Sequence, residues 1–175
     1  LGVLSIPVSV IWIVAITNAV NLIDGLDGLA CGVSTISSMT LLVISLVVSD
    51  APAAILMAAL AGSCIGFLPY NLNPAKIFMG DTGSLFLGGA VCGLAFALDI
   101  PLVLILVGII YILETLSDIL QVGYFKLTHG KRIFRMAPLH HHLELGGWSE
   151  VKLFCVFSGV TLLACVLAFL GVMGR

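Results

Sequence analysis

Residues 151–173 read VKLFCVFSGVTLLACVLAFLGVM, and Lys152 is the only charged residue among them. A helix needs about 20 mainly apolar residues to cross the hydrocarbon core of a bilayer. No proline interrupts this run. The stretch therefore predicts a transmembrane helix, and it indicates the class of protein to which the rest of the chain belongs.

Five further apolar runs lie upstream, at about 1–17, 31–49, 52–70, 83–99 and 101–124. Of all 175 residues 61% are hydrophobic and 9% are charged, and the mean hydropathy is +1.24. Soluble domains carry about 25% charged residues, and a soluble fold of this size could not bury so much apolar surface. We predict an all-α, polytopic transmembrane bundle of about six spans that forms one domain over residues 1–175. Small residues such as Gly88 and Gly89 suit close packing of helices in lipid.

The connections between these runs differ in length and polarity. Two are short turns, at 50–52 and 99–101, and three are long and polar, at about 18–30, 71–82 and 125–150. If all six runs cross the membrane, the long connections lie on one face. That face or its border carries every basic residue except Arg175: Lys76, Lys126, Lys131, Arg132, Arg135 and Lys152. Because cytoplasmic loops are enriched in Lys and Arg, we expect the long loops in the cytoplasm.

The first long connection reads NAVNLIDGLDG from Asn18 to Gly28. Asp24 and Asp27 are three residues apart, so a helical or turn-like backbone would present both carboxylates on one side. Paired carboxylates suit a divalent cation or the hydrogen-bond donors of a base or sugar. The structural alternative is a helix end followed by an Asx-rich turn.

The second connection reads NLNPAKIFMGDTGS over residues 71–84 and leads into an apolar helix. A helix start offers unpaired N–H groups that favour phosphate, and Asp81 beside it could hold Mg²⁺. The alternative is that Asp81, Thr82 or Ser84 caps the helix. Phe78 could stack on a nucleobase or anchor the chain at the membrane interface.

The third connection contains KRIFRMAPLHHHLE, residues 131–144. Its basic residues could hold an anion, and its three consecutive histidines are expected to diverge. The alternatives are contact with anionic lipid headgroups and zinc capture.

In the preceding run, Glu114 and Asp118 lie on one helical stripe, with Gln121 one turn beyond. Ionisable side chains within a membrane helix indicate function, or a structural partner on another helix.

Together these three blocks resemble the polyprenyl-phosphate N-acetylhexosamine-1-phosphate transferases. The DGLDG and GDTGS blocks are typical of the whole superfamily, and the MAPLHHH block resembles its phospho-N-acetylmuramoyl-pentapeptide transferase branch. The resemblance implies UDP-N-acetylmuramoyl-pentapeptide as donor, undecaprenyl phosphate as acceptor, UMP as product and Mg²⁺ as cofactor. It places the chain in the bacterial cytoplasmic membrane with its active site facing the cytoplasm. The expected partners are these two substrates and the lipid bilayer, with a homodimer left open and no nucleic acid.

The resemblance also implies roles for individual residues. Asp81 would be the metal ligand, and the catalytic groups would be Asp24, Asp81, His140 and His141. Substrate would be contacted by Asn18, Asn21, Gly25, Leu26, Asp27, Asn71, Phe78, Gln121 and His142. Within this set, Gly25, Leu26, Asp27, Asn71 and Phe78 would hold uracil.

The sequence departs from the family in one important respect. The family carries an Asp-Asp-x-x-Lys motif near its start, whereas this chain has no adjacent Asp pair and begins at Leu1. We therefore expect residues 1–175 to be the C-terminal part of a larger domain and to be inactive alone. Two alternatives remain open: a UDP-N-acetylglucosamine transferase of the same superfamily, and an ion-coupled transporter that uses Glu114 and Asp118.

Overall fold

The computed structural model describes residues 2–174, which form helices joined by turns and loops, with no strand among them. Leu1 of the first predicted span and Arg175, the basic residue assigned to the opposite face, lie outside the described residues. The elements in chain order are η1 Gly2–Leu4, α1 Ser5–Leu22, α2 Leu29–Val47, α3 Ala51–Asn71, α4 Gly80–Ala97, η2 Pro101–Val103, α5 Leu104–Val107, α6 Ile109–Leu127, α7 Leu139–Glu144 and α8 Glu150–Met173.

Five helical stretches are long and apolar enough to cross a membrane: η1 with α1, and α2, α3, α4 and α8. This confirms the all-α membrane fold. Two boundaries move relative to the prediction, because α1 extends to Leu22 and α4 begins at Gly80. Asn18 and Asn21 are therefore helical residues, and Asp81 lies in the first turn of α4.

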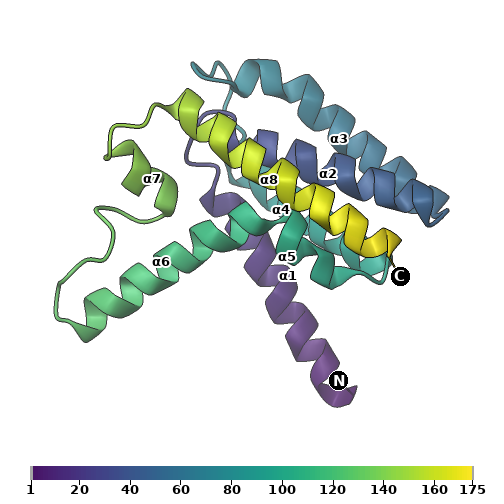
Figure 1. Ribbon diagram of the computed structural model, residues 1–175, viewed down its shortest axis with the longest axis horizontal. Coiled ribbons are helices and arrows are strands. Elements are labelled where there is room, and N and C mark those ends of the chain that lie inside the picture. The colour runs from purple at the N-terminus through teal and green to yellow at the C-terminus, as the bar shows by residue number, and fades with distance from the viewer. Residues whose placement is uncertain (1, 175) are drawn as a thin grey trace.

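The predicted span 101–124 is not one straight helix. Pro101–Val107 and Ile109–Leu127 meet at 81°, so the expected sixth span is broken at Gly108. A side chain at position 108 would meet the Leu104 carbonyl oxygen at 2.8 Å and the Tyr111 ring at 2.9 Å. The glycine permits the bend, which directs α6 away from the bundle (Figure 1).

Helix α2 is the centre of the bundle, since it packs against α3 on one side and α8 on the other (Figure 1). Small hydroxylated residues of α2 also contact α5 and α6. Ser37 donates to the Val107 carbonyl at 2.8 Å, and Ser34 pairs with the Tyr111 hydroxyl at 3.0 Å. Such short side chains allow helices to approach closely in lipid.

The second packing unit is α1 against α4, with α6 also contacting α1. A Cβ on Gly88 of α4 would lie only 2.7 Å from Thr17 Cα of α1. The expectation that glycine serves close helix packing here is therefore confirmed at Gly88. This contact positions the end of α1 beside the start of α4.

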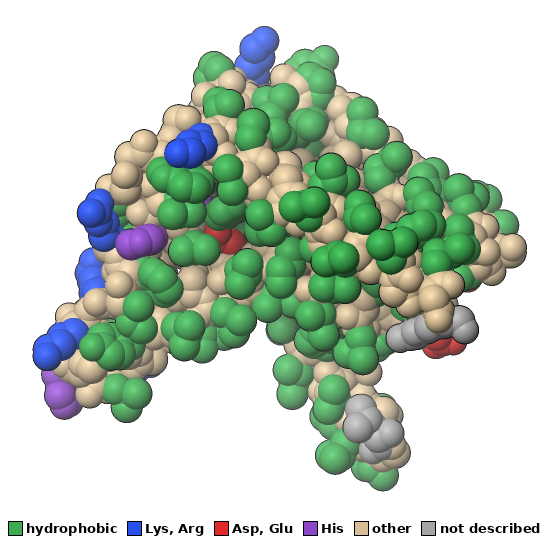
Figure 2. All heavy atoms as spheres, viewed as in Figure 1, with side chains coloured by type: hydrophobic (Ala, Val, Ile, Leu, Met, Phe, Trp, Pro, Cys, Tyr) green, Lys and Arg blue, Asp and Glu red, His purple; other side chains and the backbone are tan. Residues whose placement is uncertain are grey.

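Surface composition agrees with burial of the bundle in lipid. Hydrophobic side chains cover most of the face in Figure 2, whereas Lys and Arg gather along its upper and left edges. In the same view, the α3–α4 connection and α7 occupy those edges (Figure 1). The basic residues and the long polar connections thus share one side of the molecule.

Candidate active site

The site is centred on the turn 23–28, which joins α1 to α2. Gly28, just before α2, has a φ of 76°, a left-handed conformation that glycine adopts without steric cost. The turn holds Asp24 and Gly25 between two other segments, the start of α4 and the helix α7. All three sequence blocks therefore meet here.

The first junction lies between α1 and α4. The Asn21 amide donates to the Asp81 carboxylate at 3.1 Å and to the Ser84 hydroxyl at 2.8 Å. Met79 precedes α4 and no side chain caps it, so the alternative in which Asp81, Thr82 or Ser84 is the helix cap is wrong. Asp81 instead carries a carboxylate in the first turn, where negative charge is favoured.

The pKa of Asp24 is raised from 3.8 to about 6, chiefly because the carboxyl is partly withdrawn from water. The nearby backbone N–H of Gly80 opposes this shift, and the negative charge of Asp81 reinforces it. These effects require Asp24 and the Gly80–Asp81 segment to be neighbours. Two carboxylates from separate blocks are thus brought together.

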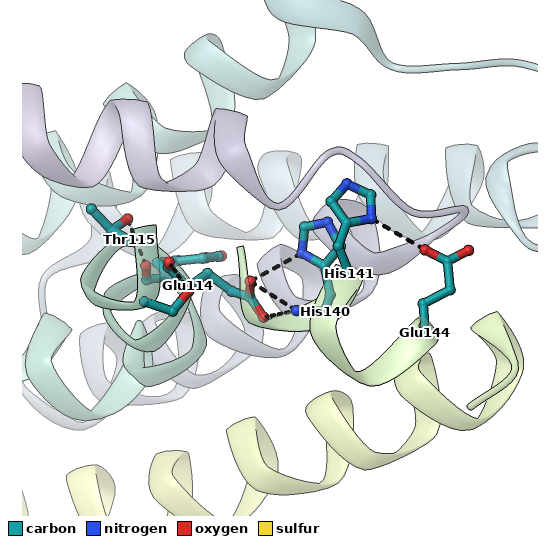
Figure 3. Close-up of polar contacts among 7 residues, drawn as sticks. Glu114, Thr115, His140, His141 and Glu144 are labelled. Atoms are coloured by element: carbon teal, nitrogen blue, oxygen red, sulfur yellow. Dashed lines mark hydrogen bonds and ion pairs between the residues drawn. The ribbon is translucent and has the colours of Figure 1, made fainter. Parts of the chain in front are cut away.

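The second junction is formed by α7. The prediction that its three histidines diverge is wrong for the first two, because the ring centroids of His140 and His141 lie only 4.2 Å apart. The His140 backbone N–H donates to the Glu114 carboxylate at 3.1 and 3.2 Å, and His140 Nδ1 lies 3.0 Å from Glu114 Oε2 (Figure 3). His141 Nδ1 lies 3.1 Å from Glu144 Oε2 (Figure 3), and His142 Nδ1 accepts the Arg135 backbone N–H at 3.1 Å. Each imidazole therefore has its own hydrogen-bond partner.

Gly25 lets α7 lie close to the 23–28 turn. A Cβ on Gly25 would lie 3.1 Å from His140 Nε2 and 3.9 Å from His141 Nε2. Both imidazoles therefore face the backbone that follows Asp24. The structure brings together four predicted site residues of the turn and α7 (Asp24, Gly25, His140 and His141) and joins them to Asn21 and Asp81.

Two further predicted residues stabilise the connection between α3 and α4. Asp27 accepts the Ala75 backbone N–H at 2.9 Å and the Asn73 amide at 3.2 Å. The buried amide of Asn71 donates to the Ile77 carbonyl at 3.0 Å. Leu26 is buried. The contacts of Asp27 and Asn71 are thus with the loop, and their predicted role in holding uracil stays a prediction.

The remaining predicted residues lie apart from this junction. Phe78 is 75% exposed and borders an apolar groove of about 680 Å³ between α3 and α4. Asn18 is exposed, and its amide donates to the Val14 carbonyl of the preceding turn. Gln121 is buried, donates to the Phe134 carbonyl at 2.9 Å, and accepts the N–H groups of Ile133 and Phe134 at 3.0 Å each. Its amide thus stabilises the loop before α7.

Sequence reasoning flagged Glu114 as an unusual intramembrane carboxylate but not its partner. Glu114 and His140 are 1% and 0% exposed, and they are 26 residues apart in the chain. Ser84 was considered only as a cap, whereas its hydroxyl accepts from Asn21. No local pattern could have revealed either pairing.

The donor set is suited to Mg²⁺. Among residues 2–174, no three His, Cys, Asp or Glu side chains converge so that they could bind a metal by themselves. Mg²⁺ is usually bound by one or two carboxylates together with water and substrate phosphates. Asp81 and the neighbouring Asp24 supply such oxygens, so the residues present fit the ion.

Comparisons with known proteins identify the family of the chain. The sequence profile of Glycosyl transferase family 4 matches residues 1–99. Relatives named phospho-N-acetylmuramoyl-pentapeptide-transferase include those of Clostridium perfringens strain SM101, 54% identical over 169 residues, and Clostridium botulinum strain Eklund 17B, 52% identical over 170 residues. Each alignment covers 97% of this chain and 52% of the relative, so the chain spans about half the length of these curated relatives. The chain belongs to glycosyl transferase family 4, which confirms the family resemblance drawn from its three motif blocks.

Proposed function

We propose that the protein containing this chain transfers phospho-N-acetylmuramoyl-pentapeptide from its UDP donor to undecaprenyl phosphate, releasing UMP. The observation that carries the proposal is the convergence at the 23–28 turn. Asp24 lies beside Asp81 of α4, and Gly25 lies beside His140 of α7. The names of the clostridial relatives favour the muramoyl-pentapeptide donor over N-acetylglucosamine.

The reaction brings two anions together, the acceptor phosphate and the donor diphosphate. When bound, Mg²⁺ supplies positive charge that offsets their repulsion and stabilises the developing UMP leaving group. Asp81 is the proposed ligand, and Asp24 faces the same position. Asn21 orients the Asp81 carboxylate through the 3.1 Å hydrogen bond. The protein's contribution is thus chiefly to position the two substrates.

The imidazoles of α7 contribute from the opposite side of the turn. His141 is 29% exposed and lies beside Gly25, so its free ring nitrogen can reach a phosphate or sugar oxygen of the donor. Arg135, in the preceding loop, donates to the Leu145 carbonyl at 2.7 Å and adds positive charge near α7. These groups are suited to recognition of the anionic donor.

The test compares Asp81→Asn with Asp50→Asn in the full-length protein that contains this chain. Purified protein in lipid nanodiscs receives undecaprenyl phosphate, Mg²⁺ and labelled UDP-N-acetylmuramoyl-pentapeptide, and the lipid-linked product is counted. Loss of an electrostatic group at the reacting centre typically lowers turnover about 100-fold or more. Asp50 caps α3 through the Ala53 N–H, and Asn is an equally good cap, so Asp50→Asn should leave turnover unchanged.

Two results would contradict the proposal. The first is turnover by Asp81→Asn close to that of the unchanged protein. The second is preferential use of UDP-N-acetylglucosamine when both donors compete, which would favour the other branch of the superfamily. An ion-coupled transporter would yield no lipid-linked product from either donor.

The proposal puts the site at the cytoplasmic face of the bacterial inner membrane. The basic side chains lie along the edge that carries α7 and the long connections (Figure 2). Lys131→Cys in the loop before α7 and Ser49→Cys in the turn between α2 and α3 test this orientation. A membrane-impermeant maleimide added to intact spheroplasts should label position 49 and spare position 131, and the reverse pattern would refute the orientation.

A further inference from the structure

Glu114 and His140 form a buried pair, and the proposed function gives the Glu114 carboxylate no role. Glu114 is 1% exposed and His140 is 0% exposed, so neither carboxylate nor imidazole contacts water. The carboxylate is held by the His140 main-chain N–H and lies 3.0 Å from the His140 ring (Figure 3). A buried carboxylate in a membrane helix is costly to maintain, so a specific function is the expected reason for it.

The hydrogen bonds indicate where the imidazole carries its proton. The His140 N–H lies within 3.2 Å of both Glu114 oxygens, the arrangement expected for an ionised carboxylate. Such a group only accepts hydrogen bonds. His140 Nδ1, which faces Oε2, must then be the donor, and in the neutral imidazole Nε2 carries the lone pair.

The other ring nitrogen faces the catalytic turn. His140 Nε2 is buried and has no hydrogen-bond partner among residues 2–174. It lies 3.1 Å from the position a Cβ would occupy on Gly25, while Gly25 itself is exposed. The nitrogen therefore lies one layer of backbone beneath the surface at which the donor is proposed to bind.

We propose that Glu114 is a positioning residue of this site, which acts through His140. It fixes the His140 ring with its proton on Nδ1 and its Nε2 lone pair against the Asp24–Gly25 backbone. A carboxylate that sets the tautomer and orientation of a functional imidazole is a recurrent device in enzymes. The role of Glu114 in turnover rests on the proposed transferase function, whereas the tautomer assigned to His140 does not.

Glu114→Gln offers a sharp test because glutamine has nearly the same shape. Its carboxamide oxygen can still accept the hydrogen bond from the His140 backbone N–H, but its NH₂ group then faces His140 Nδ1. Two donors cannot face each other at 3.0 Å, so the imidazole proton must move to Nε2. Glu114→Gln should therefore invert the tautomer, whereas Glu114→Asp keeps an ionised acceptor and should preserve it.

The first measurement is nitrogen-15 NMR of histidine-labelled protein in nanodiscs, with His140 assigned by its loss in His140→Gln. We expect a protonated Nδ1 and an unprotonated Nε2 in the unchanged protein and in Glu114→Asp, and the reverse in Glu114→Gln. A proton on Nε2 of the unchanged protein would overturn the proposal, even if a variant failed to fold. The same tautomer in Glu114→Gln as in the unchanged protein would also overturn it.

The second measurement is transferase kinetics. Outer partners of functional histidines typically matter by about 10–100-fold, so Glu114→Gln should lower kcat in that range with little change in KM, and Glu114→Asp should recover part of it. Asp118→Asn is the matched control, because Asp118 lies one turn further along α6 and its carboxylate makes no hydrogen bond among residues 2–174. Equal loss in Glu114→Asp and Glu114→Gln would overturn the role of the tautomer. Absence of transferase activity in the unchanged protein would instead refute the proposed function and leave the NMR result standing.

Discussion

Gly88 determines how closely α1 approaches α4, and Gly88→Ala tests the importance of that approach for the site. The added Cβ would lie 2.7 Å from Thr17 Cα, 3.0 Å from the Thr17 carbonyl oxygen and 3.2 Å from Val20 Cβ. The nearest of these atoms belong to the backbone of α1, which cannot rotate out of the way. The two helices must therefore separate.

The size of the effect follows from these distances. Ordinary contact begins near 3.4 Å, so α4 must retreat by about 0.7 Å. Ser84 lies one turn before Gly88, and its 2.8 Å bond from Asn21 would lengthen to about 3.5 Å, the limit for a hydrogen bond. Overpacking costs about 1–3 kcal/mol, and a weakened hydrogen bond adds about 0.5–1.5 kcal/mol. The gain in helix propensity from Gly to Ala offsets about 1 kcal/mol of this.

Gly89→Ala is the matched control. This substitution raises the helix propensity of α4 by the same amount as Gly88→Ala, yet the added Cβ would meet only Thr17 Oγ1, at 4.0 Å. The helix-propensity gain is common to both variants and cancels. The free energy of unfolding, measured in mixed detergent micelles through the fluorescence of Trp12 and Trp148, should therefore be lower for Gly88→Ala than for Gly89→Ala by about 1.5–4.5 kcal/mol. If the two variants proved equally stable, the close α1–α4 contact would not be what orders the site.

Two further predictions concern the turn and the loop before α7. The pKa of Asp24 is raised to about 6 in the folded protein, so the folded state binds this proton more tightly than the unfolded state does. The resulting contribution to the free energy of unfolding is complete below pH 3.8 and is lost as the pH rises through about 6. Without divalent cations, Asp24→Asn should therefore stabilise the protein by about 1–2 kcal/mol near pH 7.5, after allowance for solvent screening, and by nothing near pH 4; equal effects at both values would refute the assignment. Gln121→Ala removes the acceptor of the Ile133 and Phe134 N–H groups, so hydrogen exchange at these two amides should accelerate about 10-fold or more. Gln121→Glu keeps that acceptor and should protect both amides, and unchanged exchange in Gln121→Ala would show that other contacts hold the loop.

The site residues were predictable to the extent that their chemistry is unusual in a membrane protein. Carboxylates, amides and imidazoles are rare beside hydrocarbon, so Asp24, Asp81 and His140 stood out without any structure. The side chains of Gln121 and Asp27 stood out for the same reason. Their hydrogen bonds go to loop backbone, which residue type alone cannot distinguish from contact with a ligand.

The sequence by itself determined which segments are apolar enough to enter lipid, because transfer of a helix into hydrocarbon depends on the composition of about 20 consecutive residues. It also determined the family, since the three polar blocks are local strings. Only the tertiary structure decided that the span at 101–124 breaks at Gly108, that Gly88 rather than Gly89 meets α1, and that Glu114 belongs to His140. These outcomes depend on which atoms of distant segments occupy the same space, and close packing leaves room for one arrangement that no short stretch of sequence specifies.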